Sequence, residues 1–201
     1  EILPFSTPTS KLEGEHVRGV ILSGGPESVY AEGAPYCEDE VFRLGIPTLG
    51  VCYGMQLMAK VLGSDVRPAQ HREYGHAVIA CRNGSVLFKG VGSELKVWAS
   101  HGDRIETLPK GFHLTASSDA APVAAFENTD VGHYGVQFHP EVAHTEHGTE
   151  ILRNFAFEIC GLRGDWSMSS YSEEAIQRIR ERVGSDNVVC GLSGGVDSSV
   201  A

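Results

Sequence analysis

The chain has 201 residues, 41% of them hydrophobic and 21% charged, a composition typical of globular proteins. With 16 Lys and Arg against 26 Asp and Glu, its formal net charge is −10, which disfavours nonspecific binding to nucleic acid or to an anionic membrane. No apolar run approaches the roughly 20 residues of a membrane span, and the N-terminus lacks a secretory pattern. The 5 cysteines form no CxxC pair, which argues against a disulfide framework and favours a reducing, cytoplasmic location.

Apolar runs alternate with helical patterns over roughly the first 155 residues, which is typical of a layered α/β domain. The expected elements, in chain order, are strands at 17–22 and 46–51, a helix after Cys52, short strands between 77 and 126, a strand at 135–138, a helix at 149–159, a helix ending at Val183 and a strand at 187–192. The boundaries that follow are a first domain at 1–160, a linker at 161–171 and the beginning of a second domain at 172–201.

The segment Gly50-Val51-Cys52-Tyr53-Gly54 has the form Gly-x-nucleophile-x-Gly. A sharp turn from strand to helix crowds the backbone, so small residues are needed two positions before and after the nucleophile. The sulfur would then lie near a helix N-terminus, where the dipole favours a thiolate. A buried structural cysteine is the alternative, because free cysteines are often small core residues.

His139-Pro140-Glu141 offers a base for such a thiol. Proline disfavours helix at the residue before it, and residues two apart in extended chain project to the same side. Glu141 can therefore orient the imidazole of His139 while the other ring nitrogen faces Cys52, as in a catalytic triad. The alternative is a surface turn that happens to contain these residues.

Acyl transfer also needs donors for the developing oxyanion. The turn Ser23-Gly24-Gly25-Pro26 follows a predicted strand and lets the backbone approach a ligand closely. The backbone amides of Gly25 and Tyr53 are the candidates for this oxyanion hole, although a Gly-Gly-Pro sequence can also be only a turn.

Near the C-terminus a predicted strand leads directly into a glycine loop. The loop lacks the Lys of a Walker motif, but successive N–H groups and serine hydroxyls can converge on phosphate oxygens. A Gly-Ser-rich linker is the alternative. The predicted ATP-binding residues are Ser193, Gly194, Gly195, Val196, Asp197, Ser198 and Ser199.

SGGP, GVCYGMQ and HPE, in this order and at these intervals, resemble the triad-type glutamine amidotransferases over roughly residues 1–160. The resemblance implies a three-layer open mixed sheet with helices on both faces, whose first strand and helix would precede Glu1. It also implies that Cys52, His139 and Glu141 hydrolyse glutamine to glutamate and ammonia through a thioester, without a metal or organic cofactor. The residues that it implies for glutamine binding are Gln56, Ser100, Gly102 and Asp103.

The glycine loop resembles that of the ATP pyrophosphatases, SGGxDS, which implies ATP with Mg²⁺ as a requirement of the complete protein. The order of the two domains resembles a family of carbon–nitrogen ligases. In that family xanthosine 5′-monophosphate (XMP) is adenylated, and ammonia from the first domain displaces AMP. The resemblance also implies a homodimer formed through regions beyond Ala201. Expected partners are thus glutamine, ATP and XMP, with no nucleic acid and no membrane.

Two other functions remain open on the sequence alone. The first is a stand-alone cysteine hydrolase that cleaves γ-glutamyl or peptide bonds, and the second is a degenerate, non-catalytic regulatory domain. His139, His144 and His147 lie close together with two glutamates, but their spacing matches no familiar zinc pattern, so no metal site is predicted.

Overall fold

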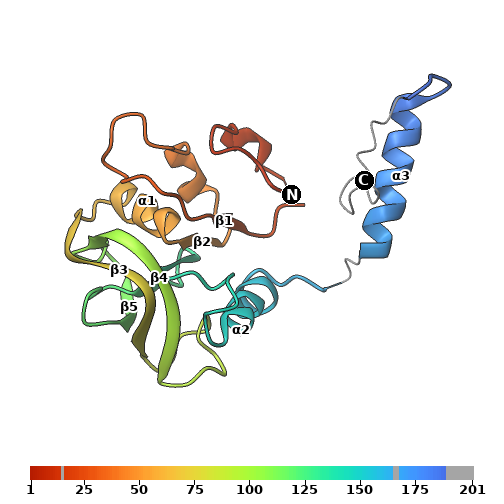
Figure 1. Ribbon diagram of the computed structural model, residues 1–201. Helices are drawn as coiled ribbons and strands as arrows, with labels where there is room; N and C mark the ends of the chain where they lie inside the picture. Colours follow the sequence, from red (N-terminus) through yellow and green to blue (C-terminus); the bar gives the residue numbers. More distant parts are fainter. Residues whose placement is uncertain (15, 165–167, 189–201) are drawn as a thin grey trace. The chain divides into compact units, whose positions relative to one another are not determined.

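The computed structural model describes residues 1–14, 16–164 and 168–188, and the chain divides into two compact units, residues 1–162 and 163–201 (Figure 1). The described part of the first unit contains a seven-stranded mixed sheet with the strand order β1-β2-β7-β6-β5-β3-β4. The strands are β1 (Val20–Leu22), β2 (Thr48–Val51), β3 (Val66–Cys81), β4 (Glu94–Ile105), β5 (His113–Ser117), β6 (Ala125–Asn128) and β7 (His133–Val136).

Three neighbouring strands, β1, β2 and β7, run parallel, and the remaining neighbours pair antiparallel. The register pairs Leu22 with Gly50 and Gly50 with Gly135. The carboxyl ends of the parallel strands therefore meet at one edge of the sheet, where open α/β sheets usually bind ligands. The segments after these three ends carry Ser23, Cys52 and Gln137.

Helices cover both faces of the sheet. The first unit contains α1 (Tyr53–Val61), α2 (Gly148–Arg153), the π-helical η3 (Asn154–Ile159) that continues α2, and the short 3₁₀ helices η1 (Thr9–Lys11) and η2 (Asp39–Arg43). The described part of the second unit contains α3 (Met168–Val183). None of the described helices is long and apolar enough to span a bilayer.

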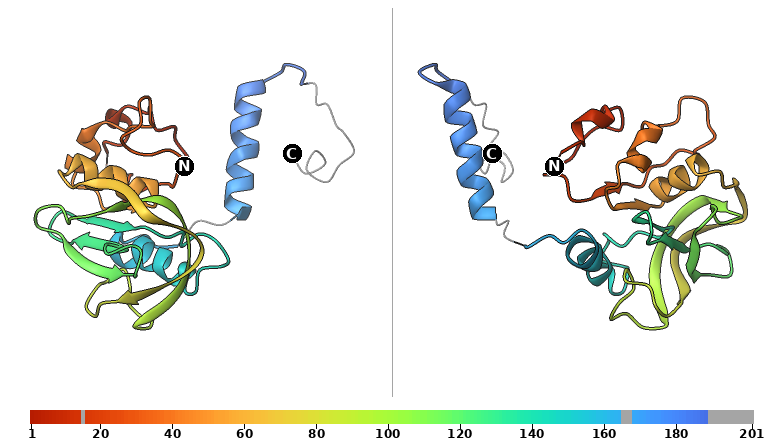
Figure 2. Two further views of the ribbon diagram at one scale, coloured as in Figure 1. Left: turned by 60° about the vertical axis from the view of Figure 1, so that its left-hand side comes forward. Right: turned by 180° about the vertical axis from the view of Figure 1, so that it is seen from behind.

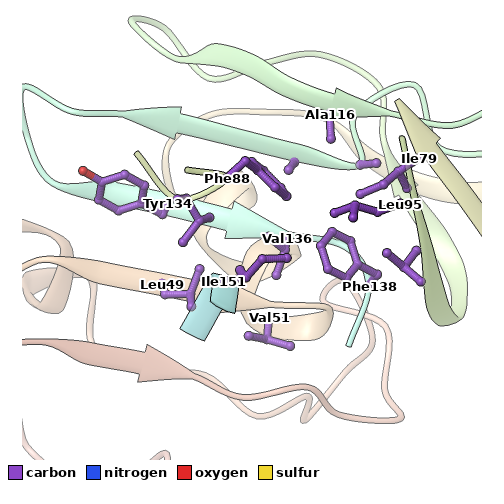
Figure 3. Packing of buried hydrophobic residues seen from close by; sticks show 14 of the residues in the cluster. Leu49, Val51, Ile79, Phe88, Leu95, Ala116, Tyr134, Val136, Phe138 and Ile151 are labelled. Carbon is purple, nitrogen blue, oxygen red and sulfur yellow. The ribbon is translucent and has the colours of Figure 1, made fainter. Parts of the chain in front are cut away.

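The alternation of side chains along β2 and β7 explains this two-sided packing. Leu49 and Val51 point to one face, where they pack in a cluster with Val136 and Ile151 of α2 (Figure 3). On the other face Gly135 leaves room for Met55 of α1, because a Cβ there would lie 2.6 Å from the Met55 side chain. The predicted three-layer α/β architecture is therefore confirmed.

The longest pairing in the sheet is the curved hairpin of β3 and β4 (Figure 2). Its register shifts between Pro68 and Glu73, where a bulge interrupts the ladder. Along β4 nearly every second side chain is buried, which is the period of a strand with one face on the core. This strand contributes several groups to the site described below.

Some predicted boundaries differ from those observed. Of the strand predicted at 17–22 only 20–22 pairs with β2, because Pro47 precedes β2 and has no N–H to extend the ladder. The strand predicted at 135–138 ends at Val136: the amide of Gln137 still donates to Ala124 O in the β6–β7 register, but the amide of Ala124 donates to Ala116 O and does not return the bond. Helix α3 begins inside the predicted linker. Residues 187 and 188 are not in a strand, and the rest of the strand predicted at 187–192 lies outside the described residues.

Candidate active site

Cys52 occupies a sharp turn between β2 and α1. Its backbone has φ 51° and ψ −107°, a region that a residue with a side chain rarely adopts. Such strain persists only where the surroundings hold it. Here the Cys52 amide donates to Val136 O at 2.8 Å, and the Cys52 carbonyl accepts the first hydrogen bond of α1 from the amide of Gln56 at 3.1 Å. The backbone therefore places Cys52 at the carboxyl edge of the parallel strands.

The two glycines that flank this turn have no room for a side chain. A Cβ on Gly50 would lie 2.6 Å from backbone atoms of Met55, and one on Gly54 would lie 2.1 Å from the carbonyl oxygen of Leu22. The crowding expected from the Gly-x-Cys-x-Gly spacing is thus present, and it results from α1 packing directly against β1 and β2.

Both the imidazole and the backbone of His139 have hydrogen-bond partners. Its Nδ1 lies 2.7 Å from Oε1 of Glu141, and since a carboxylate only accepts, Nδ1 carries the hydrogen. The backbone amide of His139 donates to Trp98 O at 3.0 Å. Thr145 donates through Oγ1 to the carbonyl of His139 at 2.6 Å. The second ring nitrogen, Nε2, therefore carries the lone pair that a base requires.

Gly24 brings Cys52 and His139 together. A Cβ on Gly24 would lie 2.9 Å from Cε1 of His139 and 3.6 Å from Cβ of Cys52, so both side chains border the same glycine. The thiol of Cys52 donates to Ser100 O at 3.7 Å and accepts a hydrogen bond from Nε2 of Gln137 at 3.8 Å. Cys52, His139 and the glycine turn after β1 thus share one site.

Burial raises the pKa of the Cys52 thiol to about 11, because the site excludes the water that would stabilise a thiolate. The nearby carboxylates of Glu141 and Asp103 also raise this pKa, whereas the backbone N–H of Tyr53 and the amide of Gln137 lower it. A thiol with this pKa does not ionise by itself at neutral pH. A neighbouring base must therefore take its proton.

The predicted oxyanion-hole residues are neighbours. The Cβ position of Gly25 lies 3.5 Å from Cγ of Tyr53, and the N–H of Tyr53 hydrogen-bonds to the sulfur of Cys52. The turn after β1 and the first residue of α1 therefore border the nucleophile from two sides. Their role in stabilising an oxyanion stays a prediction.

The predicted glutamine-binding residues also converge on this site. Nε2 of Gln56, which is 3% exposed, donates to Asp103 O at 3.1 Å. The carboxylate of Asp103 accepts a 2.7 Å hydrogen bond from the hydroxyl of Tyr30. The carbonyl of Ser100 contacts the thiol, and the Cβ position of Gly102 lies 3.6 Å from the side chain of Arg72. The predicted ATP-binding residues 193–199 lie outside the described residues.

The family model of the class-I glutamine amidotransferases matches residues 1–159. The chain belongs to this family. It is 53% identical to a GMP synthase [glutamine-hydrolyzing] of Carboxydothermus hydrogenoformans and 52% identical to that of Syntrophomonas wolfei, in both cases over its full length. It spans 40% and 39% of the length of these relatives.

Solved structures with a similar fold include members of this kind of protein. The amidotransferase is similar to a Thermoplasma acidophilum protein described as one of the subunits of a GMP synthase, with a TM-score of 0.69 and 34% identity over 89% of this chain and 84% of that one. A glutamine amidotransferase from Thermotoga maritima gives a TM-score of 0.59 at 24% identity, over 82% of this chain and 66% of that one, which shows a shared fold.

A buried histidine of β4 contacts a glutamate of β3 next to the predicted glutamine-binding residues of this amidotransferase. Nε2 of His101 lies 3.1 Å from Oε2 of Glu73, and Nδ1 lies 3.1 Å from Asp103 O. Burial lowers the pKa of His101, while Glu73 and the Asp103 carbonyl oppose that shift. Both ring nitrogens of His101 therefore face oxygen atoms. This pair connects β3 to β4.

Three residues of this site were missed by the sequence interpretation. Gln137 contacts the sulfur of Cys52, Thr145 contacts the backbone carbonyl of His139, and Tyr30 contacts the carboxylate of Asp103. Only Gln137 had a usable signal, because it lies two positions before His139, and such positions share a face in extended chain. Thr145 and Tyr30 are placed by tertiary packing alone.

The histidines near the predicted triad have other partners. The ring of His144 lies 4.8 Å from that of Trp98, and Nδ1 of His147 lies 3.8 Å from Oε2 of Glu150. Among the residues that the structure describes, no group of three or more His, Cys, Asp and Glu side chains is arranged to hold a metal ion.

Proposed function

We propose that Cys52 of this amidotransferase hydrolyses the side-chain amide of glutamine to glutamate and ammonia. The observation that carries this proposal is the pairing of a strained strand-to-helix turn at Cys52 with a carboxylate-oriented imidazole at His139, both bordering Gly24. Neither a structural cysteine nor a chance surface turn requires this combination. A degenerate, non-catalytic domain would have no need of the strained backbone at Cys52.

In the proposed reaction Nε2 of His139 takes the thiol proton as the sulfur attacks the amide carbon of glutamine. The N–H groups of Gly25 and Tyr53 stabilise the oxyanion. When the carbon–nitrogen bond breaks, His139 returns the proton to the leaving nitrogen, and ammonia departs. Water, deprotonated by His139, then attacks the thioester, and the carbon–sulfur bond breaks to give glutamate and the free thiol.

The substrate's amino-acid end would bind beside β4. Asp103 is 8% exposed and its carboxylate is held by Tyr30, so it is positioned to pair with an α-ammonium group. Gln56 bonds to the backbone of Asp103, Ser100 contacts the thiol, and Gly102 precedes Asp103 in β4, so these residues would bind the remaining polar atoms of glutamine. A substrate without the α-ammonium group should therefore bind poorly.

For the complete protein we propose the activity of a GMP synthase (glutamine-hydrolysing), a ligase of purine nucleotide biosynthesis in the cytoplasm. The support is about 50% identity to such relatives over this chain, together with the SGGVDSS segment at 193–199. In this proposal the segment binds ATP with Mg²⁺, XMP is adenylated, and ammonia from Cys52 chemistry converts it to GMP. The homodimer implied by the resemblance belongs to the same proposal.

The test separates the two halves of this reaction. In the full-length protein, Cys52→Ala should abolish glutamine-dependent GMP formation and leave the reaction with added ammonium unchanged. Loss of both reactions would contradict the proposed division. A stand-alone hydrolase would instead cleave γ-glutamyl or peptide substrates without ATP and XMP, so an assay on such substrates distinguishes the second candidate. Tyr36→Phe is the control, because the hydroxyl of Tyr36 donates to Asp39 and to none of the predicted site residues.

A further inference from the structure

Two buried carboxamides connect the sulfur of Cys52 to strand β4. Nε2 of Gln137 donates to Sγ at 3.8 Å, and Oε1 of Gln137 accepts from Nε2 of Gln56 at 3.1 Å. The same Nε2 of Gln56 donates to Asp103 O at 3.1 Å. Gln137 is 1% exposed and Gln56 is 3% exposed, so both amides are shielded from water. Hydrogen bonds in such surroundings are stronger than at the surface.

The chain of bonds fixes which end of each amide faces the next group. Asp103 O can only accept, so Gln56 must present Nε2 to it. A turned Gln56 would set two oxygens against each other. Gln56 Nε2 in turn requires an acceptor on Gln137, which leaves Nε2 of Gln137 pointing at the sulfur. A backbone carbonyl of β4 therefore determines that an N–H, and not an oxygen, faces Cys52.

We propose that Gln137 is a positioning residue for the nucleophile, whose N–H, oriented by Gln56, holds the sulfur of Cys52 and stabilises its thiolate. This inference rests on the proposed function of Cys52. A hydrogen bond to a charged atom is roughly twice as strong as one to a neutral atom, so the contact favours the thiolate over the thiol. Negative charge develops on the sulfur as His139 takes its proton and returns to the sulfur when the thioester breaks, so Gln137 assists both steps.

The experiment measures how the reactivity of the Cys52 thiol depends on pH in the full-length protein. Iodoacetamide modification is followed by mass spectrometry of the Cys52 peptide between pH 6 and pH 10, with Cys81 in the same samples as the internal reference. Gln137→Glu keeps an acceptor for Gln56 and replaces the donor by a carboxylate. Gln137→Met removes both groups without adding charge. Thr115→Val is the matched control, because Thr115 is buried and its Oγ1 has no partner.

We expect Gln137→Glu to slow Cys52 modification at pH 7.5 at least tenfold and to move its pH profile upward by a unit or more, since one pKa unit corresponds to a factor of ten. Gln137→Met should slow it about threefold to tenfold, and Thr115→Val should not change it. Glutamine hydrolysis should fall in parallel in the two Gln137 variants. Unchanged Cys52 profiles in both variants would overturn the proposal.

Two further measurements distinguish a failure of this inference from a failure of the proposed function. Glutamine hydrolysis that persists in Cys52→Ala would overturn the proposed function itself, whereas hydrolysis that depends on Cys52 with unchanged Gln137 profiles would overturn this inference only. If circular dichroism shows that both Gln137 variants are unfolded, the side-chain amide signal of Gln137 is followed by ¹⁵N NMR in the unsubstituted protein. That signal should shift as Cys52 ionises and stay constant in Cys52→Ser; a signal that is independent of pH in the unsubstituted protein would contradict the proposal.

Discussion

The hydroxyl of Tyr30 donates a 2.7 Å hydrogen bond to Oδ1 of Asp103. Tyr30 lies in the segment after β1 that also carries Gly25, and Asp103 lies in β4. The strands β1 and β4 form the two edges of the sheet. The bond therefore connects the candidate oxyanion turn to the candidate glutamine-binding strand. It also holds the Asp103 carboxylate in one orientation before substrate arrives.

Removing this hydroxyl should weaken glutamine binding. We expect Tyr30→Phe to raise KM for glutamine about tenfold with a smaller change in kcat, because one hydrogen bond to a charged group is lost from a half-exposed side chain. Steady-state glutaminase kinetics measure the effect. Tyr36→Phe is the matched control, since its hydroxyl bonds to Asp39 at 2.6 Å away from the site. Equal KM values for both variants would show that the Tyr30 bond has no role in binding.

The packing around the nucleophile turn should make its glycines intolerant of any side chain. Gly54→Ala should lower the free energy of unfolding by about 3 kcal/mol or more, because the new methyl group would overlap the carbonyl of Leu22. Gly92→Ala, where a Cβ would lie 3.4 Å from its nearest atom, should change it by less than about 1 kcal/mol. Urea unfolding compares the two, and similar losses would mean that the turn relaxes more easily than its geometry implies.

The two partners in the imidazole–carboxylate pair should differ in their contributions. His139→Ala should reduce kcat for glutamine about 10³-fold, since the thiol then has no base. Glu141→Gln keeps an acceptor for Nδ1 but removes the charge, and because the Glu141 side chain is half exposed we expect a loss of only about tenfold. Glutamine turnover with ammonia detection measures both. A larger loss for Glu141→Gln than for His139→Ala would reverse the assigned roles.

A buried histidine away from the site should make stability depend on pH. Burial lowers the pKa of His133, whose Nδ1 has no partner. The unfolded chain therefore takes up a proton that the folded chain does not, and stability falls as the pH drops below the ordinary value of about 6.5. The loss reaches up to about 1.4 kcal/mol per pH unit.

Urea midpoints at pH 8, 6.5 and 5 test this dependence. His133→Gln should flatten the decrease toward pH 5, and the exposed His113→Gln should retain it. A decrease of the same size in His133→Gln would assign the acid sensitivity to other groups.

Local sequence patterns were sufficient to predict the turn at Cys52 and the pair at His139. Gly50, Gly54 and the His-Pro-Glu segment act over only a few residues, and the packing that they imply is the packing observed. The alternation of apolar runs likewise predicted a layered α/β domain, whereas the helices on both faces of the sheet were expected from the family resemblance.

Contacts between distant segments could not be predicted in this way. Thr145 contacts His139 and Trp98 because β4 lies beside the segment after β7, which no periodicity reveals. Strand ends were also misplaced where a ladder lost a donor, at Pro47 because proline has no N–H and at Ala124 because its amide donates to Ala116 O. Neighbouring residues do not determine these features, because they depend on hydrogen bonds between distant segments that form only when the sheet forms.

One strand, β4, supplies a carbonyl to the backbone of His139, a carbonyl to the thiol and the carboxylate of Asp103. These three groups belong to Trp98, Ser100 and Asp103, which lie within one continuous stretch of strand. A displacement of this stretch would disturb proton transfer, thiol orientation and substrate recognition in the same event. Each molecule should therefore be either active or inactive in glutamine hydrolysis. An intermediate activity of a sample should reflect a mixture of active and inactive molecules.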